Sequence, residues 1–294
     1  MAQSARNLAI ITSITFIGAS SMNARAQQLV LPAPPKPPVP GLEELARKAQ
    51  NPLSDLTSAL LENNFGFGFG LSNGLQYNAN LEEIYPVRLV DQLGLVQRFI
   101  VPFIAQPETV PGQGSNGGLG DIQYQAYFTS VNQTGFIFGL GPIVSIPSAY
   151  PHELGSGKWS AGPTASAVAV VGDWVAGVQV NQLWSISSYN DRPSVSQMQL
   201  QPFINLNLQS QFLGAWYLTS SPLMTANWKA GIHDRWTVPL GGGVGKVFRI
   251  SKQAVKTELQ AFDALISPNQ GPDWSIRLQF QFLFPSQKEN KSSL

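Results

Sequence analysis

The chain contains no cysteine and few charged residues, and both shortages limit what it can be. Charged side chains make up 12% of its 294 residues, whereas a soluble domain typically has about 25%. Without cysteine the chain has no disulfide framework, no thiolate metal site and no cysteine nucleophile. The formal net charge is +1, with no block of either sign, so nothing indicates a nucleic-acid partner.

Long hydrophobic runs are also scarce. After residue 26, no stretch supplies the ~18 consecutive apolar residues that a membrane-spanning helix needs. Near the start, the apolar run from Leu8 to Ile17 follows Arg6 and precedes the small-x-small sequence Ala24-Arg25-Ala26. This order predicts a signal peptide over residues 1–26 that is cleaved after Ala26, with an uncleaved anchor as the alternative. If the mature chain enters a membrane, it must do so as a closed barrel.

Proline and leucine dominate the next segment. Residues 27–41 include a Pro-rich run at 32–40, which predicts a stiff, extended linker. Residues 42–64 carry apolar side chains at helical spacing, and Pro52 divides them into two short predicted helices: Leu42, Leu45, Ala46 and Ala49, then Leu53, Leu56, Leu60 and Leu61. This segment is interpreted as a periplasmic arm, a docking motif, a plug in a barrel or a helical element at the barrel's end.

From residue 65 to residue 285 the apolar period changes from helical to two residues. Between residues 274 and 284, one face carries Trp274, Ile276, Leu278, Phe280, Phe282 and Phe284, and the other carries Ser275, Arg277, Gln279 and Gln281. The same alternation occurs at residues 121–129, 174–186, 197–209 and 234–250. A period of two predicts β-strands with one apolar face.

Two all-β architectures fit this alternation: a soluble sandwich and a barrel in an outer membrane. The polar face is rich in Gln, Asn, Ser and Gly but poor in Lys and Glu, which is unusual for a water-exposed surface. Aromatic residues gather at segment ends, as an interfacial girdle requires: Trp159, Trp174, Trp184, Trp216, Tyr217, Trp228, Trp236 and Trp274. The last strand ends on Phe284, and a terminal aromatic is typical of barrels recognised by the outer-membrane insertion machinery.

The prediction is therefore an all-β, closed antiparallel transmembrane barrel over residues 65–285, followed by a polar tail at 286–294. Turn signals divide the barrel into eleven or twelve segments. Because single-chain bacterial barrels have even strand numbers, twelve strands are predicted, with ten as the alternative. The lipid bilayer of a Gram-negative outer membrane is then the expected environment.

Polar and charged side chains at strand positions are the candidate lining of the lumen. Facing lipid near the midplane, an arginine or lysine would cost ~2–4 kcal/mol, so such residues are expected to face inward. The candidates are Arg98, Gln123, Gln179, Asn181, Gln199, Arg249, Lys256, Glu258, Arg277 and Gln279. They are interpreted either as selecting solutes or as an ion-pair network that fills a narrow barrel.

No catalytic, cofactor-binding or metal site is predicted. The run Gly241 to Lys246 resembles a phosphate-binding loop, but Val247 stands where Ser or Thr should coordinate magnesium. His152 and His233 are the chain's only histidines, and neither lies in a nucleophile motif. Two histidines without cysteine also do not make a structural zinc site. The chain is thus not expected to be an enzyme.

Several longer motifs resemble a known family. They are Gly155 to Thr164 (GSGKWSAGPT), Trp216 to Pro222 (WYLTSSP), Arg235 to Ile250 (RWTVPLGGGVGKVFRI) and Gly271 to Trp274 (GPDW). Over about residues 50–285 the chain resembles the outer-membrane proteins linked to the meta-pathway of phenol degradation, which are often mislabelled with the peptide-hormone name "neuromedin U". The resemblance implies an outer-membrane barrel with a transport role and no known substrate.

The functional hypothesis that follows is a passive transporter or channel for small solutes, with aromatic or hydrophobic compounds among the candidates. Two alternatives stay open. One is a structural barrel that transports nothing. The other is an outer-membrane hydrolase, which would require serine and asparagine beside His152 or His233.

Overall fold

The structure is a computed structural model, and it describes residues 41–131, 135–187, 191–208 and 215–284. These residues form one short α-helix, one turn of 3-10 helix and a closed antiparallel β-barrel of twelve strands. Both the predicted fold class and the predicted strand number are confirmed. Among the described residues, no helix has the length and apolar character needed to cross a membrane.

The elements follow one another along the chain without a crossover. They are α1 (Leu42–Ala49), β1 (Thr57–Phe69), β2 (Gly74–Arg88), β3 (Leu93–Gln106), β4 (Asn116–Leu119), β5 (Ile122–Ser130), β6 (Phe136–Ile146), η1 (His152–Leu154), β7 (Ser160–Val171), β8 (Trp174–Ser185), β9 (Ser196–Asn207), β10 (Ala215–Ser220), β11 (Met224–Asn227), β12 (Trp236–Ile250), β13 (Gln253–Ile266) and β14 (Trp274–Phe284). Two barrel strands are interrupted: β4 and β5 both pair with β3, and β10 and β11 both pair with β9 and β12.

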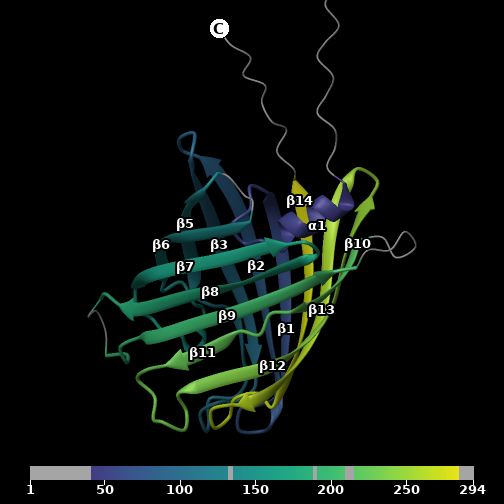
Figure 1. Ribbon diagram of the computed structural model, residues 1–294. Helices are drawn as coiled ribbons and strands as arrows, with labels where there is room; N and C mark the ends of the chain where they lie inside the picture. The colour runs from purple at the N-terminus through teal and green to yellow at the C-terminus, as the bar shows by residue number, and fades with distance from the viewer. Residues whose placement is uncertain (1–40, 132–134, 188–190, 209–214, 285–294) are drawn as a thin grey trace, which may run out of the picture. The chain divides into compact units, whose positions relative to one another are not determined.

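The barrel closes between its first and last strands (Figure 1). β1 pairs antiparallel with β14 from Thr57 opposite Phe284 to Phe67 opposite Trp274. Every described strand except the short β4, which pairs with β3 alone, therefore has a hydrogen-bonded neighbour on both sides, and the sheet closes on itself. This arrangement satisfies the backbone inside a bilayer, where water is absent.

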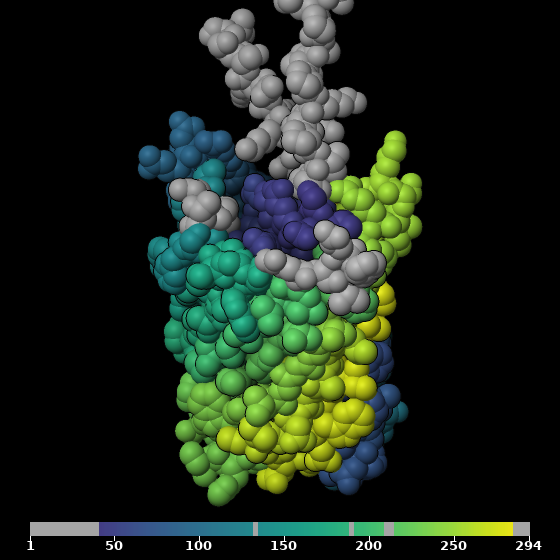
Figure 2. Space-filling model, turned by 45° about the vertical axis from the view of Figure 1, so that its right-hand side comes forward, coloured from purple at the N-terminus to yellow at the C-terminus, as the bar shows by residue number. Residues whose placement is uncertain are grey.

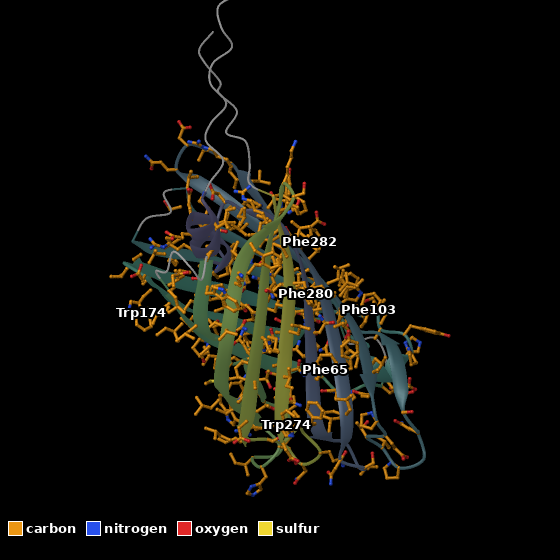
Figure 3. The ribbon with its side chains drawn as sticks, turned by 90° about the vertical axis from the view of Figure 1, so that its right-hand side faces the viewer. Phe65, Phe103, Trp174, Trp274, Phe280 and Phe282 are labelled. Atoms are coloured by element: carbon orange, nitrogen blue, oxygen red, sulfur yellow. The ribbon has the colours of Figure 1, made fainter. Side chains whose placement is uncertain are left out.

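The predicted alternation separates the two faces of the wall. In β14, Phe280, Phe282 and Phe284 are exposed on the outer surface, while Gln279 and Gln281 are buried inside. Figure 3 shows the labelled aromatic side chains along the outside of the strands, with Trp274 at the end of the barrel away from α1. An outer surface of this kind suits lipid, whereas large exposed apolar patches are rare on soluble proteins.

The two ends of the barrel differ in their connections. At the end that carries α1, called the helix end, the hairpins turn at residues 89–92, 172–173 and 251–252. At the opposite end, called the loop end, longer connections cover residues 107–115, 147–159 and 228–235. β1 begins and β14 ends at the helix end.

The predicted helical segment at residues 42–64 is partly wrong. Helix α1 ends at Ala49, and β1 begins at Thr57, so the barrel starts before residue 65. Leu60 and Leu61 contribute to opposite faces of a strand because β1 must pair with both β2 and β14 to close the sheet. The predicted signal peptide, the linker up to residue 40 and the polar tail lie outside the described residues.

Candidate functional site

A short segment before the first strand fills the barrel at the helix end. The charges of α1 match its dipole, with Glu43 and Glu44 in the first turn and Arg47 and Lys48 in the last. Its apolar side packs inward, because Leu45 and Ala46 are buried against side chains of the inner wall: Ala215, Tyr217, Val247, Ala254 and Leu283. Figure 2 shows this segment, in purple, at one end of the barrel, between the strand ends on either side.

The residues after α1 reach the other side of the wall. Leu53 is fully buried in a second apolar cluster with Tyr127, Val168, Val175 and other inward side chains. Gly139 leaves the space that Leu53 occupies, since a Cβ there would lie 2.7 Å from the leucine side chain. Residues 42–56 thus contact two sides of the lumen, and this segment is called the plug.

Polar contacts fix the plug as well. The Arg47 guanidinium lies 3.2 Å from the Asp173 carboxylate in the turn between β7 and β8. The amides of Gln50 and Asn207 exchange hydrogen bonds of 2.9 and 3.1 Å. The Lys256 ammonium donates to the carbonyl of Ala49 at 3.3 Å, where a cation stabilises the C-terminal end of a helix.

A belt of ion pairs lies inside the wall. The pairs are Glu82–Arg98 at 3.5 Å, Glu62–Arg277 at 3.7 Å and Lys256–Glu258 at 2.9 Å. All six side chains are at most 14% exposed. The belt contains three anions and three cations, so its formal charges cancel. Buried charges are tolerated only when paired in this way.

One member of this belt crosses the lumen. Arg98 projects from β3, and its Nη1 donates to Oε1 of Gln179 on β8 at 3.4 Å. From Gln179 the polar surface continues down the wall, where Nδ2 of Asn181 donates to Oε1 of Gln199 at 3.1 Å. A side chain that spans the interior in this way places a charged group across the cavity that Arg98 and Gln179 border.

A cavity of about 620 Å³ extends from the plug past the belt to the loop end. Amide side chains are the commonest residues on its wall: Gln50, Asn51, Asn78, Asn80, Gln123, Gln125, Gln179, Asn181, Gln197, Gln199, Gln201, Asn205, Gln279 and Gln281. The wall also carries an apolar strip, formed by Ile100, Pro102 and Ile104 of β3. The volume falls within the range typical of small-molecule sites.

A folded loop borders the cavity at its loop end. The Asp121 carboxylate accepts hydrogen bonds from the backbone N–H of Ser156 at 2.7 Å and from its hydroxyl at 2.8 Å. It also accepts one from the backbone N–H of Ala149 at 3.3 Å. These bonds hold residues 147–159, with η1, so that Glu153 and Leu154 line the cavity.

The structure places the ten predicted lumen residues in three ways. Eight border the cavity: Arg98, Gln123, Gln179, Asn181, Gln199, Lys256, Glu258 and Gln279. Arg277 is buried beside it and bonded to Asn64 and Ser221. Arg249 does not border the cavity; it is exposed one residue from the end of β12, where the strand reaches the rim of the helix end.

Sequence reasoning missed two carboxylates of the belt. Glu62 falls in the segment predicted to be helical, and a helical period does not indicate its inward position on β1. Glu82 lies between outward-facing Leu81 and Glu83 on β2, and the alternation of that strand was the signal that could have found it. Tyr217, assigned to the aromatic girdle, instead points inward and contacts the plug.

The features that suggested other chemistry have structural explanations. His152 and His233 are both exposed, and among the described residues neither imidazole is hydrogen-bonded to a serine. The glycine run belongs to β12, where a Cβ on Gly243 would meet the Leu259 carbonyl at 1.8 Å and one on Gly245 would overlap the Tyr217 ring. These glycines therefore allow close packing inside the barrel.

No family model matches the chain, and no curated protein matches it. Among solved structures, an outer membrane channel from Pseudomonas putida F1 is similar, with a TM-score of 0.58 and 17% identity over 78% of this chain and 96% of that one. The porin NanC gives a TM-score of 0.49 with 9% identity, over 78% of this chain and 100% of that one. At such identity the first likeness shows the fold, that of an outer-membrane β-barrel.

Proposed function

We propose that this protein is a passive channel for small polar solutes in the outer membrane, closed toward the periplasm by its plug. The observation that carries the proposal is the polar cavity, which extends from the loop end to residues 48–56 of the plug. A barrel that served only as a structural component would have no need of a solvent-sized interior bordered by fourteen amide side chains.

The connections support an orientation for this channel. Bacterial barrels have short periplasmic turns and longer extracellular loops. The helix end, with its turns at residues 172–173 and 251–252, is then periplasmic, and the loop end faces the outside. A solute entering from outside would meet the cavity first, the belt of ion pairs next and the plug last.

The lining argues for solutes that form hydrogen bonds. Amides, hydroxyls and paired charges surround most of the cavity, and a wholly hydrocarbon solute would leave them without partners. The link to phenol degradation suggested by the resemblance stays a prediction, and so does export through a cleaved signal peptide. Among the described residues neither histidine is hydrogen-bonded to a serine, and this gives the hydrolase alternative no support.

Releasing the plug should open the pathway. In Leu53→Asp, a carboxylate would replace a fully buried leucine among Tyr127, Val168 and Val175. Burial of an unpaired carboxylate costs several kcal/mol, which is about as much as the packed leucine contributes to holding the plug. The plug should therefore leave the lumen. Single-channel recordings in planar bilayers should show rare, small steps for the full-length protein and frequent, larger steps for the variant.

The matched control is Asp55→Asn, which changes an exposed side chain of the same segment. Asp55 pairs with Lys48 at the surface, and such a pair contributes about 0–1 kcal/mol. Its recordings should equal those of the unaltered protein. A silent Leu53→Asp protein that still shows the heat-modifiable gel mobility of a folded barrel would contradict the proposal and favour the structural alternative.

A further inference from the structure

The half of the lumen toward the loop end has two unlike walls. One wall carries the apolar strip of Ile100, Pro102 and Ile104, three successive inward positions of β3. All three side chains are partly accessible, and Leu154 of η1 borders the same space. The two apolar clusters that hold the plug do not include this strip, so its side chains stay accessible from the cavity.

The other wall is a row of amides. Gln197, Gln199 and Gln201 occupy successive inward positions of β9. Among the described residues, the side chain of Gln197 borders the cavity and forms no hydrogen bond. The same holds for Gln123 on β5, which lies next to Ile100 on the side of the apolar strip. Their donors and acceptors are therefore available to a solute.

The two walls face each other across the barrel. Four barrel strands lie between β3 and β9 on one side, and six lie between them on the other. The side chain of Arg98 on β3 already reaches β8, the neighbour of β9. A small solute at this level would therefore contact the apolar strip and the amide row together.

The fixed charges near this space do not call for a charged solute. The belt beside it is neutral in sum. Asp121 is occupied by Ser156 and Ala149. Glu153 borders the cavity and is exposed, and it would repel an anion at the entrance.

We infer that this half of the lumen is a binding site for uncharged amphiphiles, small molecules that combine a hydrocarbon ring with hydroxyl or amide groups. The ring would lie on the apolar strip, and the polar groups would bond to the amide row. The inference rests on the proposed channel function and names the class of solute that the channel would take.

Three glycosides test this class: phenyl β-glucoside, methyl β-glucoside and phenyl β-glucuronide. They share the sugar ring, while the second lacks the phenyl group and the third adds a carboxylate. Calorimetric titration of the full-length protein in nanodiscs should give phenyl glucoside the tightest binding. The expected gain over methyl glucoside is about tenfold, the effect of removing part of one aromatic ring from water.

Two sets of variants separate the walls. Ile100→Gln/Ile104→Gln should abolish the preference for the phenyl group and leave methyl glucoside binding within about twofold, since only the strip is changed. Gln197→Leu/Gln199→Leu should weaken both glucosides. Val101→Thr, on the outer face of the same strand β3, is the control and should change nothing.

The outcomes distinguish this inference from the proposed function. If phenyl and methyl glucosides bind equally, or the glucuronide binds best, the inference is overturned, even while Leu53→Asp conducts. If a folded Ile100→Gln/Ile104→Gln protein keeps its phenyl preference, the strip is not the site and the inference fails as well. A silent Leu53→Asp protein overturns the channel itself, whatever the titrations give.

Discussion

The two halves of the lumen are lined by different kinds of side chain although the same strands form both. Toward the helix end, Leu45, Leu53 and Tyr217 have no exposed surface and pack as in the core of a soluble protein. Toward the loop end, amides and partly exposed side chains border a cavity. The difference shows that a single barrel can be a core where a segment fills it and a pathway where none does.

Individual strands carry both halves. In β9, inward Gln197, Gln199 and Gln201 precede Phe203, which packs in the cluster around Leu53. In β8 the order reverses with the strand direction, from buried Val175 at the helix end to Gln179 and then Asn181 on the cavity. The ion-pair belt lies between the halves, and the predictions below test whether it holds the barrel, filters ions or does neither.

The largest expected effect is on stability and comes from Arg277→Met. The guanidinium lies 3.7 Å from Glu62 and donates to Asn64 at 2.9 Å and Ser221 at 2.8 Å. Its loss would leave the buried Glu62 carboxylate without its cation, at a cost of about 3 kcal/mol in the free energy of unfolding. Urea titration of the protein in phospholipid vesicles measures this change.

Two further variants make that measurement specific to the ion pair. Glu62→Gln/Arg277→Met should recover most of the lost stability, because no buried charge is then left alone. Arg249→Met, at an exposed arginine of β12, should lose no more than about 1 kcal/mol. If the single and double variants are equally unstable, the belt does not hold the barrel through charge pairing.

The sequence predicted the wall better than its contents. Alternation is a local property, so the outward Phe280 and Phe282 and the inward Gln279 could be assigned without knowing their neighbours. The start of β1 could not, because its leucines fit a helix and only pairing with β14, more than 200 residues away, makes them a strand. At the start of β1, the long-range pairing with β14 therefore overrides the helical preference of the local sequence.

The contents of the lumen depend on contacts across the barrel. Alternation gave Arg98 and Gln179 as inward residues, but their hydrogen bond requires two strands that are 81 residues apart. It also gave no means to decide which inward residues meet the plug and which meet the cavity. Arg249 shows the same limit, since it has the inward phase of β12 but lies too close to the rim.

The next effect, of intermediate size, concerns ion selectivity. Arg98→Gln removes the side chain that crosses to Gln179 and leaves Glu82 without its cation. In the Leu53→Asp background, recorded at pH 9 so that the Glu82 carboxyl is ionised, the conductance should rise and the pathway should favour K⁺ over Cl⁻, on the order of threefold at low salt and less at high salt. Reversal potentials measured across a salt gradient give this ratio.

A neutralised partner checks the cause of that preference. Glu82→Gln/Arg98→Gln should keep the higher conductance but lose most of the preference for K⁺, because the unpaired carboxylate is gone. An unchanged reversal potential in the single variant would place the ion pathway away from the belt. The boundary between the two halves would then be structural and not a filter.

The smallest expected effect is at the loop end, where hydrogen bonds to Asp121 help to hold the connection at residues 147–159. Asp121→Asn would weaken the charge-assisted bonds to Ser156, by about 1.5 kcal/mol if the amide keeps one of them.

Lys158, in the same connection, is only 6% exposed, so trypsin can cut after it only when the loop opens. Cleavage there should accelerate about tenfold, as followed by mass spectrometry, whereas Asp91→Asn in the exposed turn at residues 89–92 should have no effect. Equal cleavage rates for the two variants would mean that packing holds this loop too, and the contrast between the halves would then be one of lining alone.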